Sequence, residues 1–134
     1  MIMRANELGP NTSQYRHFVL ERLGDICVVR LGPQTLEEVQ IQEFGDDVLD
    51  LIERQGCRRM AIVFGPLDCL YSVFLGKLMT IRNRMVALGG ELRLCEVPEL
   101  AREVFRVCRL EEYFQFRPRL SDVLREWGVT DGPA

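Results

Sequence analysis

Ser72 is the residue of this sequence that offers the widest choice of chemistry. It stands in the stretch LDCLYSVFLGKL, residues 67–78, where an apolar segment passes into a predicted helix. A serine at this place can cap the helix, attack a substrate or accept a phosphate. As a cap, its hydroxyl oxygen accepts a hydrogen bond from an unpaired backbone N–H and contributes about 1 kcal/mol. Capping does not exclude a second role.

Nucleophilic catalysis by Ser72 would need a base and an acid that orients the base. The only histidine, His17, lies in the first predicted strand, and no Gly-x-Ser-x-Gly pattern surrounds Ser72. Cys69 lies near the same helix start, which can lower a thiol pKa. It lacks the same partners, however, and we interpret it as a small buried residue. The sequence therefore predicts no catalytic residue and no enzyme.

The cysteines and the glycine-proline pairs give no pattern of a ligand site. Gly32-Pro33 and Gly65-Pro66 do not belong to a phosphate-binding Gly-x-x-x-x-Gly-Lys loop. The cysteines are widely spaced and never form Cys-x-x-Cys or a paired His/Cys motif. We predict no cofactor and no metal. We interpret the five cysteines as reduced, mostly buried thiols of a cytoplasmic protein: Cys27, Cys57, Cys69, Cys95 and Cys108.

The composition is typical of one soluble globular domain. The chain has 134 residues, of which 47% are hydrophobic and 28% charged. A net charge of −3 argues against a general nucleic-acid binder. No apolar run reaches the roughly 18 residues of a membrane helix, and the first residues lack an apolar signal core. We therefore expect neither a membrane protein nor a secreted one.

Helix and strand patterns alternate along the chain. A hairpin is predicted over 15–31, turning at Gly24-Asp25. It is followed by a helix over 37–55, a strand over 57–65, a helix to about residue 88, a strand over 91–97, a helix after Pro98, a short edge strand over 113–116 and a helix over 119–127. The two longer helices have apolar stripes, formed by Val39, Phe44, Val48, Leu51 and Ile52 and by Phe74, Leu78, Ile81, Met85 and Leu88.

This order of elements predicts the α/β class. We expect a mixed sheet of four or five strands, covered by about four helices, parallel at its centre and with one antiparallel edge. Ile62 and Val63 are expected to be buried at the centre of the sheet. The domain is expected to span residues 14–127, between tails over 1–13 and 128–134. Ser72 then follows the carboxyl end of a central strand, where functional groups gather in such sheets.

The Ser72 stretch and the residues after it resemble the STAS domain, the fold of sulfate transporters and bacterial anti-sigma-factor antagonists. In the antagonists, a loop with the pattern Asp-Ser-Ser-Gly-Leu-Gly precedes a helix, a Gly-Gly pair and a strand. The resemblance covers roughly residues 15 to 127 and is aligned by Leu75-Gly76. The downstream signature is matched by Gly89, Gly90, Leu94, Cys95, Val97, Phe105, Leu110 and Phe114.

The resemblance implies a non-enzymatic interaction module that acts as a partner switch in bacterial transcription regulation. Ser72 falls on the serine that a partner kinase phosphorylates in this family. The implied partner is a protein, an anti-sigma factor that is also a serine kinase, with no direct contact to nucleic acid or membrane. The implied partner surface consists of Tyr71, Ser72, Phe74, Leu75 and Met79.

Three positions depart from the family pattern, and they leave alternatives open. Tyr71 replaces the acidic residue, Val73 the second serine and Phe74 the first glycine. One alternative is a STAS scaffold or oligomerising subunit without phosphorylation, which these departures favour. Another is a small-ligand sensor, and a hydrolase comes last. The sequence leaves self-association open.

Overall fold

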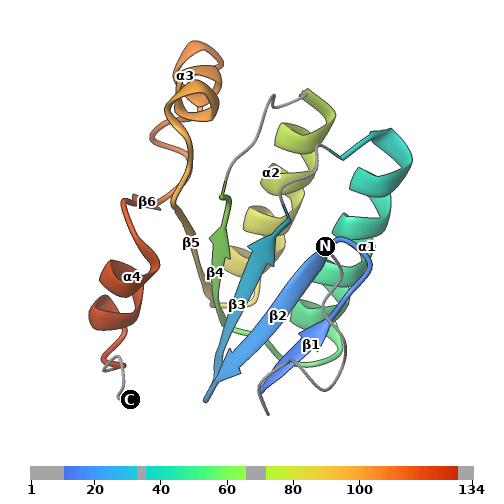
Figure 1. Cartoon of the computed structure of the whole chain (residues 1–134), viewed down its shortest axis with the longest axis vertical. Coiled ribbons are helices and arrows are strands. Elements are labelled where there is room, and N and C mark those ends of the chain that lie inside the picture. The colour runs from blue at the N-terminus through green and yellow to red at the C-terminus, as the bar shows by residue number, and fades with distance from the viewer. Residues whose placement is uncertain (1–10, 33–35, 66–71, 130–134) are drawn as a thin grey trace.

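The computed structural model describes residues 11–32, 36–65 and 72–129, which form one sheet and four helices. Figure 1 shows α1 and α2 lying against the sheet and α4 next to β6. In chain order the elements are β1 (Thr12–Gln14), β2 (Phe18–Leu23), β3 (Ile26–Leu31), α1 (Glu38–Glu53), β4 (Arg59–Val63), α2 (Ser72–Ala87), β5 (Glu91–Cys95), α3 (Glu99–Val107), β6 (Phe116–Arg117) and α4 (Leu120–Glu126).

The strands follow one another across the sheet in the order of the chain, β1 to β6. The pairs β1–β2 and β2–β3 are antiparallel, whereas β3–β4, β4–β5 and β5–β6 are parallel. The hairpin turns at Gly24, whose φ of 65° lies in the left-handed region that glycine adopts without strain. The predicted α/β class with an antiparallel edge and a parallel centre is therefore confirmed.

The central strand β4 is apolar on both faces because helices cover both. Met60 and Ile62 face the larger core, which α1, α2 and α3 share, and Ala61 and Val63 face the smaller core under α4. Ile62 is fully buried and Val63 is 5% exposed, as predicted. None of the helices among the described residues is long and apolar enough to cross a membrane.

The sheet has six strands, one more than the upper number expected from the sequence. Thr12 and Ser13, which we assigned to the tail, belong to β1 and pair with β2. The last strand, β6, begins at Phe116, where the predicted edge strand ends. Polar β1 is held by backbone hydrogen bonds, which a search for apolar runs does not detect.

Two members of the predicted apolar stripes are exposed. Val39 is 71% exposed, because the buried face of α1 begins at Ile41 and continues through Phe44, Val48, Leu51 and Ile52. Leu88 is 39% exposed, because α2 ends at Ala87 and the chain turns away at Gly89. The other stripe residues of both helices are buried in the larger core.

Candidate functional site

Ser72 is the first residue of α2, and it is exposed. It lies at the edge of the sheet where the parallel strands β3, β4 and β5 end and where the helices that follow them begin. This edge is the upper end of the molecule in Figure 1. Ser72 therefore lies at the start of the helix, as the sequence predicted, and it is open to solvent.

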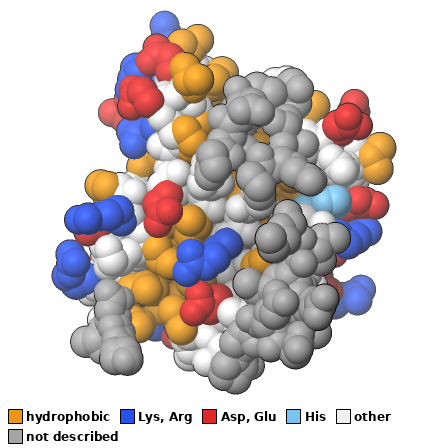
Figure 2. Space-filling model, viewed as in Figure 1, with side chains coloured by type: hydrophobic (Ala, Val, Ile, Leu, Met, Phe, Trp, Pro, Cys, Tyr) orange, Lys and Arg blue, Asp and Glu red, His pale blue; other side chains and the backbone are white. Residues whose placement is uncertain are grey.

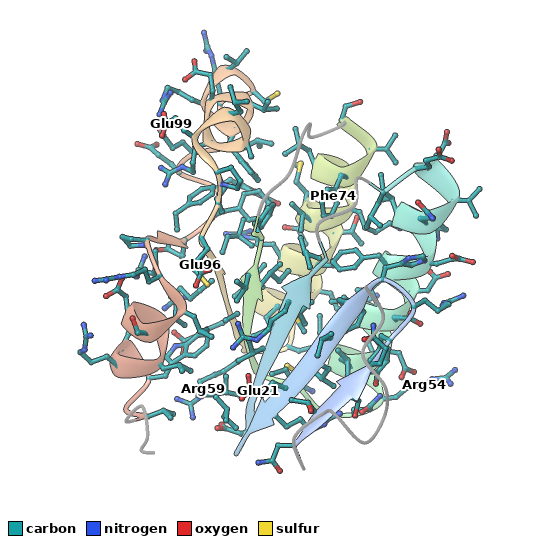
Figure 3. The ribbon with its side chains drawn as sticks, in the orientation of Figure 1. Glu21, Arg54, Arg59, Phe74, Glu96 and Glu99 are labelled. Carbon is teal, nitrogen blue, oxygen red and sulfur yellow. The ribbon has the colours of Figure 1, made fainter. Side chains whose placement is uncertain are left out.

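Phe74 and Leu75, which the resemblance assigned to the partner surface, are each only 4% exposed. The Phe74 ring packs edge-on against Phe44 of α1, with centroids 5.5 Å apart, and lies 6.2 Å from the Phe64 ring after β4. Figure 3 labels Phe74 on α2. Both side chains anchor the start of α2 to the core, so a partner that leaves the domain folded cannot rest on them.

Three exposed apolar side chains stand at the starts of α1, α2 and α3, and we call them the apolar rim: Val39, Val73 and Leu100. They are 71%, 44% and 73% exposed, and each is the second residue of its helix. Because α1, α2 and α3 all begin at the carboxyl edge of the sheet, the three side chains lie along one edge. Figure 2 shows hydrophobic side chains among charged ones at the end of the molecule where α3 lies.

The outer face of α2 continues from Ser72 with small side chains. Gly76 and Thr80 follow at intervals of four residues, and both are exposed. A Cβ added at Gly76 would meet no atom within 4 Å, so the backbone of α2 is bare there. Met79, the remaining residue of the predicted surface, is half-buried against the larger core. This face of α2 therefore presents small, uncharged side chains to a partner.

The first turn of α2 provides a favourable electrostatic environment for an anion. The first turns of α1 and α3 carry Glu38 and Glu99, whereas that of α2 has no acidic residue. The helix dipole and its unpaired N–H groups favour negative charge at such an end. Figure 3 labels Glu99 at the start of α3. Among these three helices, α2 is the one whose first turn has no negative charge of its own.

His17 pairs with a carboxylate of α1, although its neighbour Phe18 pairs with Leu31 at the carboxyl end of β3. Its Nε2 lies 2.8 Å from Oε1 of Glu43 on α1, and Arg16 pairs with Glu43 at 3.3 Å and with Asp47 at 3.0 Å. The hydrogen bond from His17 and the charge of Arg16 lower the pKa of the Glu43 carboxyl, although partial desolvation opposes this. The described contacts of His17 thus tie the chain just before β2 to α1.

The four described cysteines are all free, and three of them are buried: Cys27, Cys57 and Cys95. Cys108, which follows the last residue of α3, is exposed. Burial raises the pKa of the Cys95 thiol to about 12. No three His, Cys, Asp or Glu residues within the described ranges are grouped so that they could hold a metal ion.

Sequence reasoning placed Ser72 correctly at the start of a helix but did not predict the apolar rim. Two of the three rim residues, Val73 and Leu100, lie outside every predicted apolar stripe. An apolar helix residue outside the stripe tends to face away from the core, so the sequence did carry a signal that these two are exposed. Tyr71 and Cys69 fall outside the described residues, so their predicted roles stay predictions.

Solved structures share this fold across almost their full length. A candidate anti-sigma factor antagonist from Thermotoga maritima, TM1081, has a TM-score of 0.75 at 18% identity, over 81% of this chain and 92% of its own. RsbS of Moorella thermoacetica, as a serine-to-glutamate variant, has a TM-score of 0.70 at 17% identity, over 82% and 96%. Neither a family model nor a curated protein matches the sequence.

SpoIIAA, an anti-sigma factor antagonist and Bacillus cell fate determinant, matches in two states. Its unphosphorylated form has a TM-score of 0.68 at 20% identity, over 85% of this chain and 99% of its own. Its phosphorylated form has a TM-score of 0.62 at 20% identity, over 81% and 98%. The resemblance inferred from the Ser72 stretch is thereby confirmed in three dimensions: the chain has the STAS fold of the anti-sigma-factor antagonists.

Proposed function

We propose that this protein is a non-enzymatic, cytoplasmic partner switch of the anti-sigma-factor-antagonist kind, controlled by phosphorylation of Ser72. The observation that carries the proposal is the exposed Ser72 at the start of a helix whose first turn has no acidic residue, next to the exposed Val73. Its partner is a protein, an anti-sigma factor with serine kinase activity. The existence of the same fold in phosphorylated SpoIIAA supports the choice.

A phosphate on Ser72 should leave the domain folded. It adds about −1.5 to −2 charges next to helix N–H groups that favour anions. Phe74 and Leu75 are buried in the core, and their contacts hold the first turn in place. The modification therefore changes the surface of the domain and not its shape.

A bound partner would respond much more strongly than the domain. To cover Val73 and the outer face of α2, it must come within contact distance of Ser72, the residue beside Val73. A phosphate there would be desolvated or would repel the partner. A loss of about 2.8 kcal/mol is enough to weaken binding a hundredfold. Release thus needs no conformational change.

The test compares Ser72→Asp with Ser72→Ala, which differ in charge at the same place. The native partner is captured with the wild-type protein, identified by mass spectrometry, purified and titrated against each variant, and thermal melts are recorded alongside. We expect the Asp variant to lose at least tenfold in affinity, while its stability changes by less than about 1 kcal/mol. The Ala variant should bind normally and accept no phosphate from the partner and ATP.

Equal affinity of the Asp and Ala variants would reject the switch. It would favour the second function, a STAS scaffold without phosphorylation. One observation favours that alternative: the exposed residue next to Ser72 is Val73, where the family pattern has a second serine.

Gly76→Ala tests the contact surface separately. An alanine in an exposed helix stabilises by roughly 0.5–1 kcal/mol over glycine, and here the added methyl meets no neighbour. We expect higher stability together with weaker partner binding, because the methyl stands on the path along α2. Higher stability with unchanged affinity would exclude this face of the helix from the interface.

A further inference from the structure

Helix α3 is apolar on two sides, and only one of them faces the core of the domain. Ala101 and Phe105 are buried and hold α3 to the larger core. Leu100 and Val107 are 73% and 72% exposed, and the half-buried Val104 lies between them along the chain. Residues at intervals of four and three share one side of a helix. We call these three residues the outer α3 face.

The outer α3 face holds the most exposed apolar side chains of the described residues. Among the large hydrophobic side chains there, none is more exposed than Leu100 and Val107. Figure 1 shows their helix at the upper end of the molecule, beyond the end of β5. Exposed apolar groups that stand together on one helix side, with charged residues around them, are typical of a protein-protein contact.

The charges of α3 are divided along its length. Glu99 stands in the first turn, its side chain is 84% exposed, and its ion pair with Arg106 is long, at 3.9 Å. Arg106 is engaged more closely by Glu103 and Glu111. Arg109 follows the last turn, is exposed, and forms no ion pair within the described ranges. The helix thus has a weakly paired anion at its first end and an unpaired cation at its last end.

A second copy of this chain matches this pattern. A two-fold axis turns one copy end for end, so that the two α3 helices run antiparallel. Glu99 of each copy then meets Arg109 of the other, because they stand five residues before and five after Val104. Leu100 meets Val107 of the second copy in the same way. A parallel pair would instead bring Glu99 next to Glu99 and oppose the helix dipoles.

We propose that the outer α3 face is a self-association surface, through which two copies of this chain pair with their α3 helices antiparallel about a two-fold axis beside Val104. Each copy contributes three apolar side chains and two charges. This is less than the roughly 800 Å² per partner of a standard interface. The dimer is therefore weak, with a dissociation constant on the order of 100 µM, and it forms as the local concentration of the chain rises.

This inference does not rest on the proposed phosphorylation switch. Leu100 belongs to both surfaces, but Val107 and Arg109 lie at the other end of α3 from the apolar rim. Ser72→Asp, which tests the switch, should leave self-association unchanged. Failure of either proposal can thus be recognised without the other.

The first test measures the mass of the full chain by sedimentation equilibrium, from about 10 µM to about 1 mM, on either side of the expected dissociation constant. The wild-type protein should pass from monomer to dimer. Val107→Asp should weaken the dimer roughly tenfold or more, because it places a charge in an apolar contact. The matched control is Val86→Asp on α2, where the valine is 51% exposed, and it should dimerise like the wild-type protein.

A charge exchange tests the antiparallel arrangement. Glu99→Arg and Arg109→Glu should each weaken the dimer about fivefold, because like charges then meet at both ends of the helix pair. The double variant restores opposite charges at both contacts only when the helices are antiparallel, and it should regain wild-type affinity. Such recovery also shows that the substitutions leave the domain folded. Weakening that persists in the double variant would reject the arrangement.

A cross-link then tests the register. In a Cys108→Ser background, which removes the exposed native thiol, Leu100→Cys and Val107→Cys chains are oxidised separately and as an equimolar mixture. We expect disulfide-linked dimers that join one chain of each kind, identified by intact mass, and few in the separate samples. Cross-links mainly between identical variants, a dimer that Val107→Asp does not weaken, or a monomer at about 1 mM would overturn the proposal. The last result would leave the outer α3 face to a different protein partner.

Discussion

Phe74→Ala tests whether the start of α2 is anchored as the structure indicates. Phe74 is 4% exposed and contacts the rings of Phe44 and Phe64. Truncation of a buried phenylalanine to alanine costs about 3–5 kcal/mol. The edge-on pair with Phe44 alone accounts for about 0.5–1.5 kcal/mol beyond the buried area. Because Phe74 lies in the first turn of α2, where the chain can relax, we expect a value near the lower limit, about 3 kcal/mol.

Urea unfolding, followed by circular dichroism, measures this loss. With an m-value of about 1.5–2 kcal/mol/M for a domain of this size, the midpoint should fall by roughly 1.5–2 M at unchanged m. The matched control is Val73→Ala, the neighbouring residue, which is 44% exposed. Its stability should change by no more than about 0.5 kcal/mol. The two residues are neighbours in the helix, but Phe74 faces the core and Val73 faces solvent.

A loss below about 1 kcal/mol for Phe74→Ala, or equal losses for both variants, would refute this account of α2. It would mean that Phe74 is free to leave the core, and the partner surface inferred from the family resemblance would again include it. Under the proposed function, Val73→Asp tests the exposed residue for partner binding, as Phe74→Ala tests the buried one for stability. It should weaken partner binding while leaving the urea midpoint nearly unchanged.

Two further predictions concern the support of the fold. Gly90→Ala should destabilise by roughly 2 kcal/mol, because the new Cβ would lie 2.6 Å from the backbone oxygen of Arg58, which cannot move aside as the flexible Met85 side chain can; an unchanged melting temperature would contradict this. Glu126→Gln should flatten the acid limb of the stability curve. Hydrogen bonds from two arginines lower the pKa of Glu126 below its ordinary value of 4.5, so its stabilising effect is complete above that pH and is lost as the pH falls through the folded-state pKa. Urea titrations at a series of pH values measure the difference, and parallel curves for both proteins would reject it.

The sequence predicted the central elements because their buried positions form a clear pattern of apolar residues. The run that became β4 is apolar at every position from Met60 to Val63, since both faces of the sheet are covered. The stripe of α2 repeats at intervals of four, three and four from Phe74 to Met85. In contrast, β1 is polar and is held by backbone pairing with β2, and side-chain pattern does not report such pairing.

Val39 shows how a stripe can be extended too far. Its distance of five residues from Phe44 does not fit one face of a helix, whereas Ile41, three residues before Phe44, does. Ile41 is 1% exposed and Val39 is 71% exposed. Phe74 and Leu75 show the opposite error. The family resemblance assigned both to the partner surface, whereas the apolar stripe already placed Phe74 on the core side of α2; Leu75 lies outside that stripe, and only the structure shows that it is buried.

The same packing sharpens the proposed switch. With Val73 in place of a second serine, and with Val39 and Leu100 exposed at the neighbouring helix starts, a partner at this edge would gain mainly from apolar burial. A phosphate on Ser72 would then have to be buried among apolar groups, where an uncompensated charge costs far more than it does in a polar, hydrated contact. The departures from the family pattern thus make the surface less suited to polar recognition of the unmodified serine. They also make any partner that binds there more sensitive to the charge.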